Sequence, residues 1–385
     1  MPTGCVPSFE EIALSDAVSA WTAAAEGVTE WWTSAVRRRA TPPQLMLESV
    51  QWWAEVVDRR RPTWSSPNRI VFEAPVARLR DFSTHGREHL VPTLVLPPQA
   101  GHDSCIVDYS STQSQMRTII EAGLTGAYSL DWIGATDDTK DATIDDYLDV
   151  IDRSIDRLGG KVNLVGDCQG GWLATIYAAL EPERVNTLTI AGAPIDFHCG
   201  EPVIVAALNS LAPSGDLAFY RSLVAAGGGR LDGRHMLAGF IAIQPENEVA
   251  RQLALLANID DPAHVARYRE FEDWFKHTQP IPGAFYLWIV EHLFRDNELI
   301  AGKLRVGDRR VDLGRIACPL NLLGGGTDHI TPAAQVHALA DYASTEEPDV
   351  LRDTSEGGHL GLFMGHEALR HHWPRLLAAV LERSR

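Results

Sequence analysis

The sequence predicts an α/β fold in which a doubly wound, mostly parallel sheet carries an inserted helical cap and an N-terminal helical segment. Short apolar segments alternate with helical ones over residues 70–197, and the alternation resumes over residues 301–385. Residues 198–300 between them are predicted to be mostly helical, and residues 1–69 show apolar side chains at helical spacing. We therefore expect a core in two parts, 70–197 and 301–385, with a cap at 198–300 and a helical segment at 1–69.

The N-terminal segment combines helical spacing with tryptophan. Six of the eleven tryptophans lie in it: Trp21, Trp31, Trp32, Trp52, Trp53 and Trp64. An aromatic stripe of this kind is typical of helices that dock on a neighbouring domain. The alternative is an adhesive surface for a hydrophobic granule, a partner subunit or a second copy of the chain, as in a homodimer. Pro62–Pro67 marks the boundary before the first strand.

The core is predicted from short apolar runs that alternate with helical segments. Strands are expected at Ile70–Asp81, His89–Leu96, Ala127–Trp132, Val162–Val165, Val185–Ala191, Cys318–Leu323 and Val350–Arg352. Helices are expected at Ser110–Gly123, Thr143–Leu158, Trp172–Leu180, Ala333–Tyr342 and Glu367–Arg385. Because the carboxyl ends of parallel strands meet at one edge of a sheet, side chains that follow these strands are expected to lie together.

The expected cap is rich in aromatic residues, which are Phe271, Trp274, Phe275, Phe285, Tyr286, Trp288 and Phe294. A cap inserted between strands of such a sheet would cover the edge where ligands bind. An apolar lining there favours an acyl or polyester substrate over a sugar or a phosphate. The alternative is that these aromatic side chains form only the core of the cap itself.

The stretch Gly166-Asp167-Cys168-Gln169-Gly170 lies between the strand at 162–165 and the helix at 172–180. Strand, Gly-x-nucleophile-x-Gly and helix is the pattern of a nucleophile elbow, here with cysteine as the nucleophile. The glycines are expected because the strand and the helix pack so closely around the turn that a Cβ would clash. The alternative is an ordinary turn with a buried cysteine.

Two further loops supply the partners that a catalytic cysteine needs. Asp328 and His359 each follow a predicted strand in a glycine-rich loop, so the order along the chain is nucleophile, acid, base. His359 would accept the thiol proton and later protonate the leaving group, and Asp328 would hold the His359 tautomer. Asp131 and Asp196, both at strand ends, are rivals for the role of the acid.

Supporting groups are expected around this triad. The backbone N–H of Gln169, together with one near Gly101 in the loop after the second predicted strand, would bind the oxyanion. His329, Trp172 and Asp131 are candidates for residues that contact and support the side chains of the triad. The C-terminal histidines His366, His371 and His372 have no ligand-like spacing, so a solvated helix face is expected there and no metal or cofactor is predicted.

Composition limits the remaining possibilities. The 385 residues are 45% hydrophobic and 22% charged, which is ordinary for a globular α/β domain with insertions. A formal net charge of −17 disfavours a nucleic-acid partner. The five cysteines are scattered, which favours a reducing compartment over a disulfide framework. Neither a signal peptide nor a transmembrane stretch is visible, so a cytoplasmic protein is expected.

The three motifs resemble those of the polyhydroxyalkanoate synthase and thiol-type intracellular depolymerase superfamily, which has the α/β-hydrolase fold. Gly166–Gly171 resembles the lipase-like box of the synthases, Asp328–Pro332 their Asp-His-x-x-Pro loop, and Gly357–Gly361 their Gly-Gly-His-x-Gly loop. Asn297–Leu313 is similar to the segment that precedes the acid strand in two-subunit synthases. Gln99–His102 replaces their Asn-Arg-Pro-Tyr-like stretch and looks more like the depolymerases.

The resemblance implies acyl transfer from (R)-3-hydroxyacyl-CoA onto Cys168 and then onto a growing polyester, at or near a polymer granule. An intracellular depolymerase or another thiol-dependent ester hydrolase is the alternative, in which water resolves the same acyl-enzyme. A non-catalytic granule-associated protein on a hydrolase fold is a further alternative. A cysteine nucleophile is compatible with both enzymatic readings.

Overall fold

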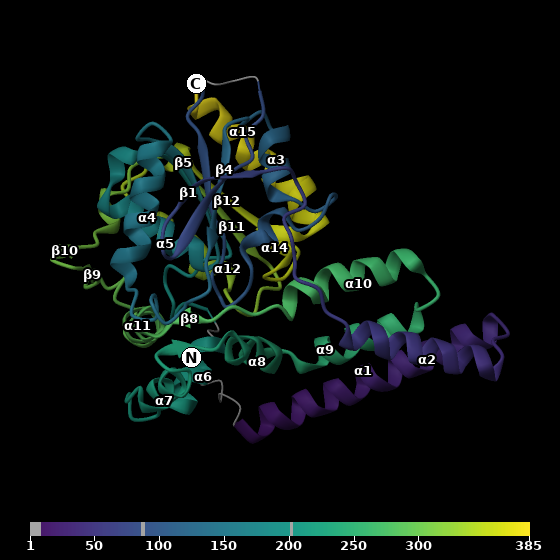
Figure 1. The fold of residues 1–385 in the computed structure, drawn as a ribbon. Helices are drawn as coiled ribbons and strands as arrows, with labels where there is room; N and C mark the ends of the chain where they lie inside the picture. The colour runs from purple at the N-terminus through teal and green to yellow at the C-terminus, as the bar shows by residue number, and fades with distance from the viewer. Residues whose placement is uncertain (1–8, 86–88, 201–202) are drawn as a thin grey trace. The chain divides into compact units, whose positions relative to one another are not determined.

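The computed structural model describes residues 9–85, 89–200 and 203–385 (Figure 1). The chain forms two compact units. One combines the chain up to Pro62 with Arg234–His277, and the other combines Thr63–Gly233 with Thr278–Arg385. The segment 198–300, expected as one cap, is thus divided between the two units, and the four-part division into domains stays a prediction.

The larger unit contains an eight-stranded sheet in the order β1-β2-β4-β3-β5-β6-β11-β12. Its strands are β1 (Arg69–Glu73), β2 (Ala77–Asp81), β3 (Thr93–Leu96), β4 (Ala127–Trp132), β5 (Val162–Asp167), β6 (Val185–Ala191), β11 (Leu320–Gly325) and β12 (Val350–Ser355). Strand β2 pairs antiparallel with both β1 and β4, and every pair from β4 to β12 is parallel. The predicted α/β-hydrolase-like fold with a mostly parallel sheet is confirmed.

Helices cover both faces of this sheet, as two-sided burial of the strands requires. They are α3 (Gln115–Glu121), α4 (Ile144–Arg157), α5 (Gln169–Leu180), α12 (Ala333–His337), α13 (Leu339–Tyr342), α14 (Gly361–Met364) and α15 (Trp373–Arg383). Figure 1 shows α4 and α5 on one side of the sheet and α3 and α15 on the other. Every residue of β3, β5 and β11 is buried, because parallel strands between two helical layers have no solvent face.

Two predicted elements differ from the structure for local reasons. The single strand expected at Ile70–Asp81 is a hairpin of β1 and β2, since Pro75 between them has no N–H for a sheet. The helix expected at Ser110–Gly123 begins only at Gln115, where the Ser114 side chain accepts a hydrogen bond from the Arg117 N–H at 2.9 Å and caps the first turn.

The segment expected to be helical after residue 197 is indeed mostly helical. In the larger unit it provides α6 (Val203–Leu211), α7 (Ala218–Ala226), α11 (Gly283–Trp288) and the π-helix η3 (Ile289–Arg295). Two short ribbons accompany these helices, β7 (Arg230–Leu231) with β8 (Ile281–Pro282) and β9 (Arg305–Val306) with β10 (Arg309–Arg310). The remaining short helices are η1 (Ser104–Asp108), η2 (Pro182–Arg184), η4 (Leu313–Arg315), η5 (Glu347–Asp349) and η6 (Ala368–His372).

The smaller unit is helical and contains α1 (Phe9–Arg37), α2 (Pro42–Val57), α9 (Pro245–Ala257) and α10 (Pro262–Phe275), with α8 (Gly233–Ile243) beginning at its boundary. Helix α1 runs so close to α9 that a Cβ at Gly27 would lie 2.4 Å from Leu253 Cβ. The core of this unit is the cluster of Leu255, Ile259, Val265 and Tyr268, against which Trp52 and Val56 pack.

The tryptophans of this unit divide into packed and exposed ones. Trp52 donates a hydrogen bond from Nε1 to the Gln252 carbonyl at 2.8 Å, whereas Trp21, Trp32 and Trp53 expose 78%, 51% and 60% of their surface. Docking of this segment on the sheet domain therefore stays a prediction, as do the adhesive alternatives. Within the described part of the chain, no helix has the length and apolar content needed to cross a bilayer.

Candidate active site

Cys168 occupies a strained turn between the end of β5 and the start of α5. Its backbone has φ of 49° and ψ of −116°, a region that residues other than glycine seldom adopt. A Cβ at Gly170 would lie 1.9 Å from the Leu96 carbonyl oxygen, and one at Gly166 would lie 2.5 Å from Gly171 Cα. Strand, turn and helix are therefore packed as closely as an elbow requires.

Asp328 and His359 meet at the same edge of the sheet, although 31 residues separate them. Asp328 follows β11 and His359 follows β12, which are neighbouring parallel strands. Asp328 Oδ2 lies 2.7 Å from His359 Nδ1, and Asp328 Oδ1 accepts hydrogen bonds from the N–H groups of Ile330 (2.9 Å) and Thr331 (2.8 Å). The carboxylate is fixed on both sides, which orients the imidazole.

The Cys168 side chain lies close enough to the His359 ring to act on its protonation. Since Nδ1 faces Asp328, Nε2 is the nitrogen left for the sulfur. Burial disfavours the imidazolium, but the interactions with Asp328 and with the Cys168 side chain outweigh it, so the pKa of His359 lies well above its ordinary value. The structure thus brings Asp328 and His359 together beside Cys168, and the catalytic roles of the three residues stay a prediction.

Cys168 lies at the N-terminus of α5, because it is the residue that precedes the first turn of this helix. The unpaired N–H groups of that turn and the helix dipole favour negative charge there. Gln169 is the first residue of α5, so its N–H lies in this turn, and its role in binding an oxyanion stays a prediction.

The other predicted oxyanion donor lies in the loop after β3. Pro97 and Pro98 have no N–H, so the donors of this loop begin at Gln99. Gly101 is buried with φ of 81°, and its carbonyl accepts a hydrogen bond from the Gln279 N–H at 2.7 Å. The elbow contacts the beginning of this loop through Gly170, and the role of Gly101 stays a prediction.

The remaining site candidates have other surroundings. Asp131 is buried against Arg80, whose Nε donates to it at 2.8 Å; burial raises the pKa of Asp131 although the arginine opposes this. Asp196 accepts hydrogen bonds from the Asn297 side chain (2.8 Å) and the His198 N–H (3.1 Å). Neither rival is the carboxylate that binds His359, and His329 is exposed.

Trp172 is buried within α5, with its ring 6.2 Å from that of Phe285 and 6.4 Å from that of Trp288. Phe285 in turn stacks on Tyr147, with ring centroids 4.0 Å apart. Some aromatic residues of the expected cap therefore pack against the elbow helix, whereas Phe271 and Phe275 stack on each other within the smaller unit.

The C-terminal histidines are less uniform than the sequence predicted. His372 is not on a solvated face: its side chain is 17% exposed and contacts Asp353 through Nδ1 (3.0 Å) and Glu367 through Nε2 (2.6 Å). Partial burial lowers the pKa of His372, but the two carboxylates outweigh this effect and raise the pKa above its ordinary value. The expectation was wrong for this residue because Asp353 comes from β12, which only the fold brings close, whereas Glu367 lies five residues before His372 in the sequence. Among the described residues, no group of three or more His, Cys, Asp or Glu side chains is arranged so that it could hold a metal ion.

Sequence reasoning missed a buried polar pair beside the nucleophile. Asp167, which precedes Cys168, is fully buried and accepts a hydrogen bond from Gln115 Nε2 at 3.1 Å. The signal was present in the sequence, since an aspartate at the end of an otherwise apolar buried strand needs a partner. That the partner is Gln115 follows only from the fold.

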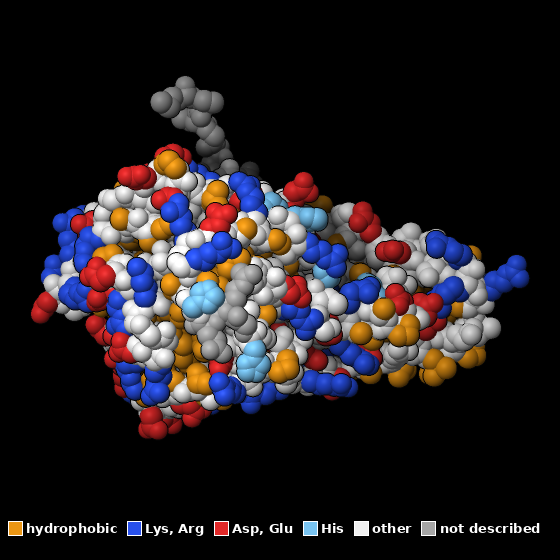
Figure 2. Space-filling view, turned by 90° about the horizontal axis from the view of Figure 1, so that it is seen from above, with side chains coloured by type: hydrophobic (Ala, Val, Ile, Leu, Met, Phe, Trp, Pro, Cys, Tyr) orange, Lys and Arg blue, Asp and Glu red, His pale blue; other side chains and the backbone are white. Residues whose placement is uncertain are grey.

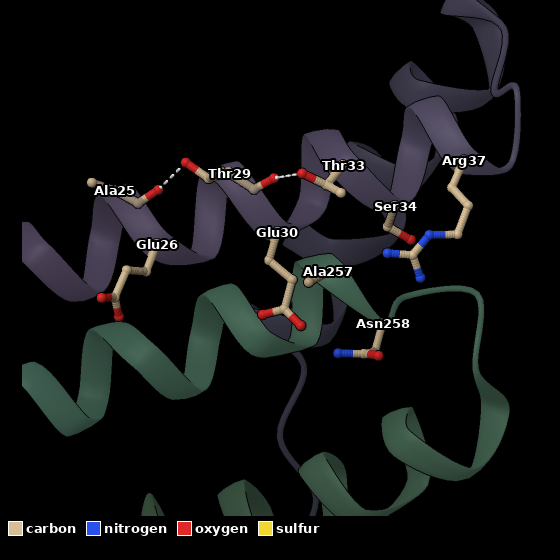
Figure 3. A pocket seen from close by; sticks show the side chains of 9 residues that line it. All are labelled: Ala25, Glu26, Thr29, Glu30, Thr33, Ser34, Arg37, Ala257 and Asn258. Carbon is tan, nitrogen blue, oxygen red and sulfur yellow. Dashed lines mark hydrogen bonds between the residues drawn. The ribbon is translucent and has the colours of Figure 1, made fainter.

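A separate pocket lies on the smaller unit, between α1 and the end of α9 (Figure 3). Its lining is largely polar and consists of Ala25, Glu26, Thr29, Glu30, Thr33, Ser34, Arg37, Ala257 and Asn258. Two of its hydroxyls are used within α1, because Thr29 and Thr33 donate to the carbonyls four residues earlier, each at 2.7 Å. The sequence predicted no site there.

A family described as "Protein of unknown function (DUF3141)" matches residues 77–380 of this chain. The chain belongs to this family. The match covers the whole sheet from β2 onward and includes all three residues of the candidate triad.

Among curated proteins the chain is similar to poly(3-hydroxyalkanoate) polymerase subunits PhaC. It is 27% identical to that of Haloferax mediterranei over 363 residues, covering 88% of this chain and 72% of the relative. It is 26% identical to that of Allochromatium vinosum, covering 70% of this chain and 75% of the relative. The resemblance to polyhydroxyalkanoate synthases inferred from the three motifs is confirmed.

Solved structures similar to this one include a lipase from Acinetobacter baumannii, described as putative, with a TM-score of 0.46, 12% identity and coverage of 88% of this chain and 96% of that one. A monoacylglycerol lipase from Paleococcus ferrophilus also has a TM-score of 0.46, with 16% identity and coverage of 79% and 99%.

Proposed function

We propose that this protein transfers 3-hydroxyacyl groups from a coenzyme A thioester to a hydroxyl acceptor through a thioester on Cys168. The observation that carries the proposal is the hydrogen bond between Asp328 and His359, with the Cys168 side chain next to the same imidazole ring. The curated relatives, which are named as poly(3-hydroxyalkanoate) polymerases, supply the acyl class.

In the first half of the reaction the sulfur replaces coenzyme A. His359 holds the thiol proton as imidazolium while the Cys168 thiolate attacks the thioester carbonyl. The tetrahedral oxyanion accepts hydrogen bonds from the Gln169 N–H and from an N–H of the loop around Gly101. When the oxyanion collapses, the carbon–sulfur bond to coenzyme A breaks, and the departing thiolate takes the proton from His359.

The second half reverses the roles of the same groups. The hydroxyl of a growing 3-hydroxyacyl chain gives its proton to His359 and attacks the acyl carbon on Cys168. Collapse of the second oxyanion releases an ester one unit longer and returns the proton to the sulfur. Asp328 stabilises the imidazolium in both halves, because its Oδ2 faces Nδ1 throughout.

Hydrolysis is the second candidate, with water in place of the hydroxyl. The loop Gln99–His102, whose sequence resembles that of thiol-type intracellular depolymerases, favours this alternative. Both reactions form the same acyl-enzyme, so they differ only in whether a hydroxyl group or water accepts the acyl group. The aromatic cluster of Trp172, Phe285 and Trp288 against the elbow helix supports an apolar acyl group for either reaction.

The test is incubation of the purified protein with 3-hydroxybutyryl-CoA, followed by intact-mass analysis and measurement of free coenzyme A. We expect a mass increase of one acyl group that is lost in Cys168→Ala and retained in Cys318→Ala. Cys318 is a matched control because burial raises the pKa of its thiol to about 11, which makes it a poor nucleophile.

The product separates the alternatives. Appearance of polymer supports transfer, and free 3-hydroxybutyrate supports the hydrolase. If Cys168→Ala releases coenzyme A as fast as the wild-type protein, the acyl-enzyme proposal is wrong. A granule-associated, non-catalytic role would be the better explanation if the wild-type protein released no coenzyme A and Cys168→Ala left the biological activity of the protein intact.

A further inference from the structure

We propose that Asp167 is held as a protonated carboxylic acid, paired with the Gln115 side-chain amide, so that no negative charge forms beside the Cys168 sulfur. The pairing itself depends only on the structure of this site. Its consequence for the nucleophile rests on the function proposed above for Cys168.

Both side chains are sealed from solvent. Asp167 is the last residue of β5 and Gln115 the first residue of α3, and each has 0% exposure. Gln115 Nε2 donates to Asp167 Oδ1 at 3.1 Å, which ties the end of the nucleophile strand to the start of a helix 52 residues earlier. A buried polar pair of this kind has no water to complete its hydrogen bonds.

Two atoms of the pair have no hydrogen-bond partner if the Asp167 side chain is an ionised carboxylate. Asp167 Oδ2 and Gln115 Oε1 are both buried, and neither has a hydrogen-bond partner. Both atoms are acceptors, so no rotation of the amide can satisfy both of them while it keeps the bond to Oδ1. A proton on Oδ2, donated to Oε1, would give each atom a partner and would close a reciprocal pair of hydrogen bonds.

The electrostatic surroundings agree with this assignment. Burial raises the pKa of Asp167 to about 8, although the hydrogen bond from Gln115 and the positive charge of His359 oppose the rise. The groups that face Asp167 are Gln115 from α3, His359 from the loop after β12, and the neighbouring Cys168. Below pH 8 the acid form is therefore favoured.

Asp167 in this state is a positioning residue for the nucleophile. A carboxylate one residue from the sulfur would oppose formation of the thiolate and raise the thiol pKa by about one unit or more, by Coulomb repulsion at partly buried separations. A neutral acid–amide pair fixes the turn with two hydrogen bonds and leaves His359 as the charged partner of the thiolate.

The test uses Asp167→Asn, because asparagine can reproduce both hydrogen bonds of the protonated acid and cannot ionise. The rate at which iodoacetamide alkylates Cys168 would be followed by peptide mass mapping from pH 4 to pH 10. We expect the acidic midpoints of the variant and the wild-type protein to coincide. A midpoint lower by about one unit or more in Asp167→Asn would show that wild-type Asp167 is ionised there, and would overturn the proposal.

A second variant and a direct measurement complete the test. Gln115→Glu places a second carboxyl group opposite Asp167, so the pair retains a negative charge, and the acidic midpoint should move upward. In the infrared difference spectrum between wild type and Asp167→Asn at neutral pH, we expect the carbonyl stretch of a protonated acid, shifted in heavy water.

Absence of that band would also overturn the proposal, even if the Gln115 variant fails to fold. Neither readout depends on acyl transfer. The proposed function can therefore fail while the protonated pair stands, and the reverse also holds.

Discussion

At the scale of single residues, the site depends on which carboxyl group faces the imidazole. Asp328, Asp131 and Asp196 all follow or end strands, but only Asp328 lies within hydrogen-bonding distance of His359. The difference is one of register, because β11 and β12 are adjacent parallel strands and bring their following loops together. Asp131 is instead neutralised by Arg80 from the antiparallel strand β2.

Asp328→Asn should lower the rate of acyl transfer to Cys168 by about 10³-fold or more, because the imidazole loses its orienting partner and the imidazolium its counter-charge. The asparagine Oδ1 can still accept from the N–H groups of Ile330 and Thr331, so the loop should keep its conformation. The measurement is the single-turnover rate of acyl-enzyme formation. Asp196→Asn is the matched control, and an equal loss in both variants would contradict the assignment.

At the scale of elements, the helices of the smaller unit bury some of their tryptophan side chains and expose others. Adjacent positions on α2 point in different directions, as the period of 3.6 residues requires. Trp52 therefore faces the cluster of Leu255 and Tyr268, while Trp53 is 60% exposed. On this helix, one tryptophan therefore belongs to the core of the unit and its neighbour to the surface.

The adjacent pair provides a matched comparison of stability. Trp52→Ala should destabilise the smaller unit by about 3 kcal/mol, because it removes a large side chain from the cluster and leaves the Gln252 carbonyl without its donor. Trp53→Ala should change stability by less than about 0.5 kcal/mol. Denaturant unfolding with far-ultraviolet circular dichroism measures both, and equal effects would mean that the exposed face is also packed in solution.

At the scale of the whole molecule, the chain passes three times from one compact unit to the other. Residues Arg234–His277, which lie between two parts of the sheet unit in sequence, join the N-terminal helices instead. Charged residues of both signs are mixed with hydrophobic ones over the surface seen in Figure 2, and the net charge is −17. The pH dependence of the free energy of unfolding depends on all of these charged groups, both the many exposed ones and the few buried ones.

Asp167 should make a separate, measurable contribution to the pH dependence of stability. Its pKa is raised to about 8 in the folded protein, above an ordinary value of about 4, so its contribution to stability is fully present below pH 4 and is lost as the pH rises through 8. Relative to wild type, Asp167→Asn should therefore gain stability between these limits, by up to about 1.4 kcal/mol for each pH unit. Other shifted groups, such as His372, are common to both proteins and cancel in the difference.

The measurement is urea unfolding of both proteins from pH 5.5 to pH 9. Parallel stability curves would mean that Asp167 has the same pKa in the folded and unfolded chains, and the protonated pair would then be excluded.

Much of the fold could be predicted because its signals are local. The bounds of β4 and β6 agree with the predicted strands, since an apolar run between turn residues identifies a buried strand. Helix α4 begins where Thr143 and Asp146 form a capping box, a pattern visible in the sequence. The predictions for 70–81 and 110–123 were wrong where a single residue, Pro75 or Ser114, decides the boundary.

The sequence by itself determined the residue types of the site, because an elbow with two close glycines, an acid loop and a base loop are each written in a few consecutive residues. Only the tertiary structure decided which groups meet. The contact of Asp328 with His359, the pairing of Asp167 with Gln115 and the contact of Asp353 with His372 all join residues from different elements. The physical reason is that the order of strands in the sheet, not the distance along the chain, sets which loops are neighbours, and spacing in the sequence carries no record of that order.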